Sequence, residues 1–272
     1  MPLITVTTSI GCGAIEVSRK VADDLKIELY DDQRLQQEAL SMGYSSEDLK
    51  GFDEKAPGLF DRLLRRRPEI YNELMAAVIY EVAHRDEGVI IGHGAAYFLK
   101  DFSCALHLRM HTSEQFRIRR LMDQLKISRE TALNMIKNRD NELKTFLDFL
   151  FQIDWNDFSL YDLVINVDKL GIDTAAEMIV KIAQAESVRE CSLTALESME
   201  KLSLLKKVEA AVMRDNINPQ ELQIDVPQPG VVKLTGLISP MRTAAGITEL
   251  IKSVAGVEKV ICEADQHPLA EL

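Results

Sequence analysis

Short apolar runs alternate with amphipathic stretches over the first two thirds of the chain. Residues 3–7, LITVT, predict a short buried strand, and in residues 14–25 the apolar positions recur at the spacing of a helix. Because parallel strands need a crossover between them, this alternation predicts an α/β domain with a parallel sheet over residues 1–190. Further strands are predicted at 27–30, 88–92, 104–110 and 162–167, and further helices at 57–85, 113–125, from Ser128 onward and at 173–185.

The pattern changes after residue 190. Two strand-like segments, ELQIDVP and GVVKLTGLI, follow each other directly, without a helix between them. With one helix before them, and a helix and a strand after them, they give the order αββαβ. Adjacent strands are typical of an α+β unit, so a second, small domain is predicted at 194–272.

Composition and charge narrow the class of protein. The chain has 272 residues, of which 46% are hydrophobic, and its formal net charge is -11. An acidic chain lacks the basic surface needed for nonspecific binding to nucleic acid or anionic membranes. Without an export signal or an apolar run of about 18 residues, we predict a cytoplasmic protein that does not insert stably into membranes.

The four cysteines form no CxxC pair and therefore indicate neither a zinc site nor a disulfide framework. Reduced thiols are predicted. The apolar C-terminal helix and the small second domain are compatible with a homodimer, which the sequence does not decide.

Candidate chemistry begins at residues 9–16, SIGCGAIE. A predicted strand runs into Gly11 and Gly13 and then into a helix. Glycines permit close approach of the backbone, and a helix N-terminus offers unpaired N–H groups to a phosphate. Taken alone, two glycines after a strand fit a plain tight turn equally well, because the lysine of the usual phosphate-loop motif is absent.

Segments spread over residues 3 to about 185 carry a resemblance to a known family. They include TTSIGCGAIEVS at 7–18, Tyr30-Asp31, IIGHGAAYFL at 90–99 and the basic helix RIRRLM at 117–122. In order and spacing they resemble the cytidylate kinase-like family. The longest matching block ends in a shared core at Trp155, Tyr161, Asp162, Leu163, Ile165 and Asn166.

The resemblance implies a P-loop nucleoside monophosphate kinase fold. It further implies transfer of a phosphoryl group from ATP to CMP, dCMP or a related nucleotide, with Mg²⁺ as the accompanying ion. The residues then implied are Arg117, Arg120 and Arg139 for catalysis, Gly11, Cys12, Gly13 and Ala14 for the donor phosphates, and Asp31, Arg67 and His93 for the acceptor.

Several of these residues also have an interpretation without a ligand. Arg117 and Arg120, three residues apart, share a helix face and also fit a solvated basic stripe. Arg67 ends the run RRR and equally fits a charged helix end that the helix dipole favours. Asp31 fits an N-cap, and His93 fits a loop histidine with no role in binding.

The chain departs from the family pattern at three positions. Thr8 and His93 stand where the family has arginines, and Ala14 stands where it has a glycine. An arginine binds phosphate through charge-assisted hydrogen bonds, which Thr8 and His93 do not provide in the same way, and Ala14 lacks the conformational freedom of a glycine. An alternative hypothesis is therefore a nucleotide sensor with little or no turnover, and a third is an assembly protein without nucleotide chemistry.

The C-terminal region resembles a BON domain. The pattern G-x-V-x-L-x-G occurs from Gly230 to Gly236, and V-x-G-V-x-x-V occurs from Val254 to Val260. BON domains are membrane-associated or ligand-binding modules. In this chain the resemblance implies a regulatory or dimerising role.

Overall fold

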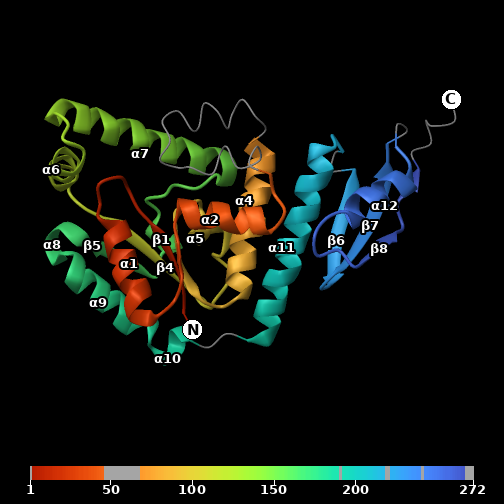
Figure 1. Cartoon of the computed structure of the whole chain (residues 1–272), viewed down its shortest axis with the longest axis horizontal. Helices are drawn as coiled ribbons and strands as arrows, with labels where there is room; N and C mark the ends of the chain where they lie inside the picture. Colours follow the sequence, from red (N-terminus) through yellow and green to blue (C-terminus); the bar gives the residue numbers. More distant parts are fainter. Residues whose placement is uncertain (1, 46–67, 190–191, 218–220, 240–241, 267–272) are drawn as a thin grey trace.

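The computed structural model describes residues 2–45, 68–189, 192–217, 221–239 and 242–266. It comprises two sheets joined by one long helix, α11, which runs from Leu193 to Arg214 (Figure 1). The predicted helix at 57–85 is described only from Pro68, so its first part lies outside these ranges. Among the described residues, no helix is both long and apolar enough to cross a membrane.

The first sheet has five parallel strands in the order β2-β3-β1-β4-β5. Its central strands are buried on both faces, as expected for a parallel sheet covered by helices. The predicted α/β class is therefore confirmed. The strands are β1 (Leu3–Thr7), β2 (Leu29–Tyr30), β3 (Gly88–Ile91), β4 (Ala105–His111) and β5 (Leu163–Asn166).

Helices cover both faces of this sheet (Figure 1). One apolar cluster unites the sheet with α1 (Ala14–Leu25) and α9 (Ile172–Ala183). A second cluster, on the other face, includes α2 (Asp32–Ser41) and α4 (Pro68–His84). The remaining helices are α5 (Ala95–Phe98), α6 (Glu114–Leu125), α7 (Arg129–Phe151), the short 3-10 helix η2 (Phe158–Leu160), α8 (Val167–Leu170) and α10 (Glu186–Arg189).

The second sheet is mixed. Strand β7 pairs antiparallel with β6 and parallel with β8 and the short β9. A separate apolar cluster forms its core against α11 and α12. The elements are β6 (Leu222–Gln228), β7 (Val231–Ile238), α12 (Ala244–Lys252), β8 (Lys259–Cys262) and β9 (Asp265–Gln266). The resemblance of this unit to a BON domain stays a prediction.

Helix α11 belongs to two cores at once. Met199 packs into the apolar cluster that contains α4, whereas Val208 and Val212 pack into the core of the second sheet. Lys206 and Ser203 also make polar contacts with α4. The helix that opens the predicted second domain is thus part of the first domain's packing as well.

One prediction about the cysteines is wrong. Cys104, just before β4, is disulfide-bonded, whereas reduced thiols were expected throughout. Cys12 and Cys262 are free, and Cys191 lies outside the described residues. The sequence offered no paired spacing for Cys104, because the residues that form a disulfide are brought together only by the fold.

Candidate active site

A cavity of about 430 Å³ lies at the carboxyl ends of β1 and β3. Ligands of open α/β sheets bind at this edge, and the volume lies within the range of small-molecule pockets. Its walls are residues 7–16, the start of α2, the turn before α5, and parts of α6 and α7. Gly11, Cys12, Gly13, Ala14, Asp31, His93, Arg120 and Arg139 all line it.

The glycine loop is shaped by backbone geometry. Gly11 and Gly13 have φ angles of 77° and 86°, in the left-handed region that favours glycine. A Cβ on Gly11 would lie only 3.2 Å from the backbone oxygen of Arg117. Gly13 is the N-cap of α1. Because glycine has no side chain, no capping side chain accepts a hydrogen bond from the first N–H groups of the helix. This arrangement suits an anion at the start of α1.

Cys12 forms the floor of this loop. It is 1% exposed, and burial raises the pKa of its thiol, although hydrogen bonds with Thr8 and Thr112 and the charges of Arg109 and Arg117 oppose that shift. At neutral pH the thiol is therefore protonated. Cys12 contributes shape and a neutral surface to the cavity, and no negative charge that would repel phosphate.

Arg117 does not line the cavity. Its Nε donates to the carbonyl oxygen of Ile10 at 2.7 Å, and its two Nη atoms contact both carboxylate oxygens of Asp140 at 2.7 and 2.6 Å. Such a bidentate pair is strong and directional. The guanidinium therefore ties the glycine loop to α7.

Arg120 and Arg139 do line the cavity, and each pairs with a carboxylate. Arg120 contacts Glu16 in the first turn of α1. Arg139 donates to Glu142 at 2.8 Å on its own helix. Because both pairs border the cavity, a phosphate entering it would compete with these carboxylates for the guanidinium groups.

At the start of α2, on the side of the cavity predicted to bind the acceptor, the polar side chains are connected by hydrogen bonds. Asp31 caps α2 by accepting from the N–H of Arg34 at 3.0 Å, as its N-cap interpretation anticipated. His93 is 1% exposed, and its Nε2 lies 2.9 Å from Asp32 Oδ1. Its Nδ1 lies 3.1 Å from the hydroxyl of Tyr71 on α4. His93 is therefore a buried link between α2 and α4 as well as part of the cavity wall.

Arg67 lies outside the described residues, so its predicted part in acceptor binding stays a prediction. His107 on β4 is buried between Thr5 and the carbonyl of Leu99. Burial lowers the pKa of its imidazole. It contributes to packing behind the site and does not line the cavity.

Arg109, near the end of β4, was missed by the sequence analysis. Its guanidinium stacks on Trp155 with 4.1 Å to the ring centroid, and burial lowers its pKa. Within the described ranges, its Nη1 has no hydrogen-bond partner. It interacts electrostatically with Cys12 and Tyr161, both of which line the cavity. A charged residue inside a strand of the predicted parallel sheet was the signal that could have found it.

Magnesium would have few protein ligands here. The described residues contain no group of three or more His, Cys, Asp or Glu side chains placed to hold a metal ion. Mg²⁺ commonly keeps several waters and is bound through one or two carboxylates plus nucleotide phosphates. The Ser9 hydroxyl and the Glu16 carboxylate, both in the cavity wall, are compatible with that mode.

Residues 3–169 match the family model described as the cytidylate kinase-like family. The chain belongs to the cytidylate kinase-like family. The match covers the whole parallel sheet and ends before the region of the second sheet. The site residues described above, apart from Arg67, thus lie in the matched and described part of a family member.

Proteins with sequences similar to this chain agree with its assignment to the family. A cytidylate kinase of Pyrobaculum islandicum is 27% identical over 64% of this chain and 89% of its own length. One from Pyrococcus horikoshii is 29% identical over 61% of this chain and 80% of its own. An uncharacterized protein from Eubacterium ventriosum, solved by crystallography, is 27% identical with a TM-score of 0.53, covering 67% of this chain and 97% of that one.

Proposed function

We propose that the protein is a nucleoside monophosphate kinase that transfers the γ-phosphoryl group of ATP to CMP, dCMP or a related nucleotide. An oxygen of the acceptor's phosphate attacks the γ-phosphorus. The bond from that phosphorus to the bridging oxygen breaks, ADP leaves with the electron pair, and a nucleoside diphosphate forms. We further propose that the enzyme acts in the cytoplasm.

The observation that carries this proposal is one cavity bordered by a glycine loop, two arginines and a polar acceptor wall. Phosphoryl transfer depends mainly on positioning and on neutralising charge. The N-terminus of α1 would hold the donor phosphates, Arg120 and Arg139 would neutralise the transferred group, and Asp31 and His93 would face the acceptor. Ser9 and Glu16 would hold Mg²⁺ together with the nucleotide, and the bound ion would supply further charge neutralisation.

The proposal is tested by measuring ADP formation with ATP and CMP, dCMP or UMP. Arg139→Gln is expected to lower kcat roughly a hundredfold, the usual effect of removing one group that stabilises transition-state charge. Arg129→Gln is the matched control, because Arg129 lies on the same helix but is exposed and contacts Gln115. Equal rates for the two variants would contradict the assigned role of Arg139.

A second candidate function is a nucleotide sensor with little turnover, which reports through the BON-like C-terminal module. It is favoured by the pairing of each predicted catalytic arginine with a carboxylate: Arg117 with Asp140, Arg120 with Glu16 and Arg139 with Glu142. Calorimetry would then detect nucleotide binding while turnover stays far below 1 s⁻¹, the lower end of about 1–100 s⁻¹ typical of kinases. Turnover within the kinase range would exclude the sensor.

A further inference from the structure

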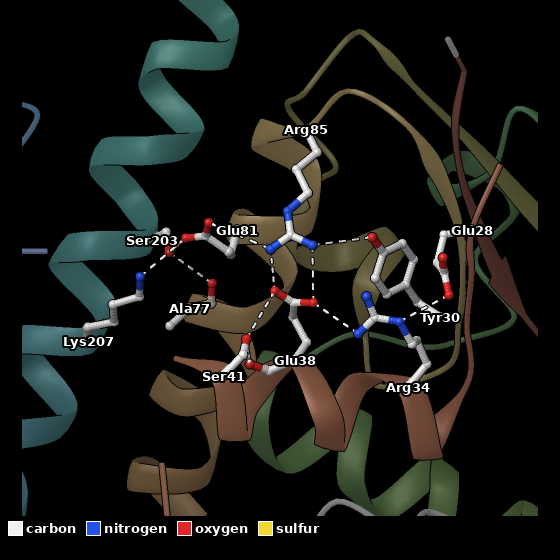
Figure 2. A network of polar contacts seen from close by, with 10 residues as sticks. All are labelled: Glu28, Tyr30, Arg34, Glu38, Ser41, Ala77, Glu81, Arg85, Ser203 and Lys207. Carbon is white, nitrogen blue, oxygen red and sulfur yellow. Dashed lines mark hydrogen bonds and ion pairs between the residues drawn. The ribbon is translucent and has the colours of Figure 1, made fainter. Parts of the chain in front are cut away.

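A buried carboxylate in the middle of α2 is the centre of a polar network. Glu38 is 3% exposed and contacts three residues, Arg85, Arg34 and Ser41 (Figure 2). Burial alone would raise the pKa of its carboxyl, but hydrogen bonds and charges of the two arginines hold it below the usual value. Glu38 is thus ionised in the folded protein.

The strongest contact of Glu38 joins α2 to the end of α4. Arg85, just after α4, binds both carboxylate oxygens, with 3.1 Å from Nη1 to Oε2 and a short contact from Nη2 to Oε1. The same guanidinium lies 3.5 Å from the hydroxyl of Tyr30 on β2. A bidentate arginine pair fixes both distance and orientation, so α2 keeps a defined position relative to α4 and β2.

The network continues from α4 to α11. Arg85 lies 3.9 Å from Glu81, one turn earlier along α4. Glu81 in turn contacts Lys207 at 3.2 Å and Ser203 at 3.1 Å, and both of these belong to α11 (Figure 2). Because Val208 of the same helix is fully buried in the core of the second sheet, α11 connects that core with Glu81.

At its other end the network reaches the cavity. Arg34, which contacts Glu38 and Glu28 through its side chain, donates its backbone N–H to the capping side chain of Asp31. Asp31 and Asp32 both line the cavity, and Asp32 contacts His93. Helix α2 is therefore attached to α4 twice, through the His93–Tyr71 contact at its start and through Arg85 in its middle.

We propose that Glu38 and Arg85 are positioning residues for the acceptor nucleotide, and that α11 acts on them through Lys207 and Glu81. A movement of the C-terminal unit that breaks the Lys207–Glu81 contact would leave the Glu81 carboxylate, 3.9 Å from Arg85, free to attract that guanidinium away from Glu38. The first turn of α2 would then shift, with Asp31 and Asp32 on it. The glycine loop and α1 take no part in this network, so ATP binding would stay unchanged.

The inference rests on the proposed kinase function and is tested in the full chain with two neighbouring lysines. Lys207→Met removes the contact with Glu81. Lys206→Met is the matched control, because Lys206 lies on the same helix and also contacts α4, but through Glu73, outside the network. The affinities for CMP and for ATP are measured separately by calorimetry, and steady-state kinetics gives KM and kcat.

We expect Lys207→Met to weaken CMP binding roughly threefold to tenfold, with KM for CMP rising in proportion while kcat and ATP affinity change less than about twofold. Lys206→Met should leave CMP affinity within about twofold of the unsubstituted chain. Glu38→Gln should weaken CMP binding more than Lys207→Met does, and thermal unfolding verifies that it is folded. If it does not fold, the lysine pair alone decides the matter.

The possible failures are distinguishable. If the unsubstituted chain neither binds nor phosphorylates CMP, dCMP or UMP, the proposed function fails, and the positioning role fails with it. If the unsubstituted chain is active but the two lysine variants have equal CMP affinities, the kinase proposal stands and the network proposal is overturned. A loss of ATP affinity equal to the loss of CMP affinity overturns it too, because a general structural weakening would produce both.

Discussion

The two sides of the cavity hold their charges in different ways. On the loop side, formed by residues 8–16 with Arg120 and Arg139, the ion pairs lie at the cavity wall, and the Glu16 side chain is 42% exposed. On the α2 side, His93 and Glu38 are buried and each contacts at least two partners. The Arg120–Glu16 pair can therefore exchange its partner with a ligand at less cost than Glu38 can. Arg139 and Glu142, 13% and 24% exposed, lie between these two cases.

The difference follows from solvation. An exposed pair loses little when it opens, because water replaces the partner. A buried charge that loses its partner retains the cost of desolvation. We infer that the loop side supplies charge that is available to a phosphate, and that the α2 side supplies a fixed shape for the acceptor.

The sharpest test of this contrast is the pair Glu38→Gln and Glu16→Gln. Glu38→Gln should lower the free energy of unfolding by about 2 kcal/mol, because it removes the charge that accepts hydrogen bonds from Arg85 and Arg34, whose side chains are 39% and 28% exposed. Glu16→Gln should lower it by less than about 1 kcal/mol. Urea denaturation of both variants measures the difference. Similar losses would mean that burial does not distinguish the two sides.

At acid pH, the unsubstituted chain and Glu38→Gln should differ much less in their free energy of unfolding. The pKa of Glu38 is lower in the folded protein than its usual value of 4.5, so its contribution to stability is fully present above that value. It is lost as pH falls through the folded-state pKa, because folding then no longer gains from the ionised form. Urea denaturation at pH 7, 5, 4 and 3 should show the gap between the two proteins narrowing only below about pH 4.5. A gap that stays constant down to pH 3 would contradict the ionised, buried pair.

Two glycine substitutions separate the cost of the left-handed backbone in the glycine loop from the cost of its close contact with Arg117. Gly11→Ala should cost about 1–2 kcal/mol for the left-handed φ, and more for the Cβ placed 3.2 Å from the Arg117 oxygen. Gly43→Ala, also at a positive φ but with no atom of the described residues within 4 Å of the added Cβ, should cost only the first part. Urea denaturation gives both values, and ATP titration should show a loss of affinity for Gly11→Ala alone. Equal costs would mean that the loop tolerates the added atom.

The smallest expected effect is a change in ATP affinity when Arg120 loses its carboxylate partner Glu16. Glu16→Gln frees Arg120 from its carboxylate and should tighten ATP binding in the absence of Mg²⁺ by up to about fivefold, which corresponds to less than 1 kcal/mol. Calorimetry with and without Mg²⁺ measures it. Weaker binding only when Mg²⁺ is present is the result expected from the proposed role of Glu16 in holding the metal. Unchanged affinity in both would show that the Arg120–Glu16 pair does not compete with phosphate.

Much of the fold was accessible from periodicity alone. The predicted strand at 3–7 is β1, the amphipathic stretch at 14–25 is α1, and the helix predicted from Ser128 onward is α7, with Ser128 as its N-cap. These features depend on residues close in sequence, whose side chains favour one local conformation. The glycines at positions 11 and 13 similarly located the loop that borders the cavity.

The roles of individual charges were less accessible. Arg117 and Arg120 look equivalent on one helix face, yet Arg117 binds Asp140 and the carbonyl of Ile10, while Arg120 lines the cavity. The buried Arg109 had no assigned role at all. The partners of these two arginines lie far away along the chain: Asp140 is 23 residues from Arg117, and Glu16 is 104 residues from Arg120.

The local pattern of apolar residues, glycines and caps was enough to specify the parallel sheet, the position of the phosphate-type loop and, through family resemblance, the class of chemistry. Tertiary packing decided which charges face the cavity, which are neutralised behind it, and that α11 joins α2 and α4 to the second sheet through Glu81 and Glu38. Local conformation is set by neighbours along the chain, whereas the ionic partners and the burial of a side chain arise only when distant segments meet.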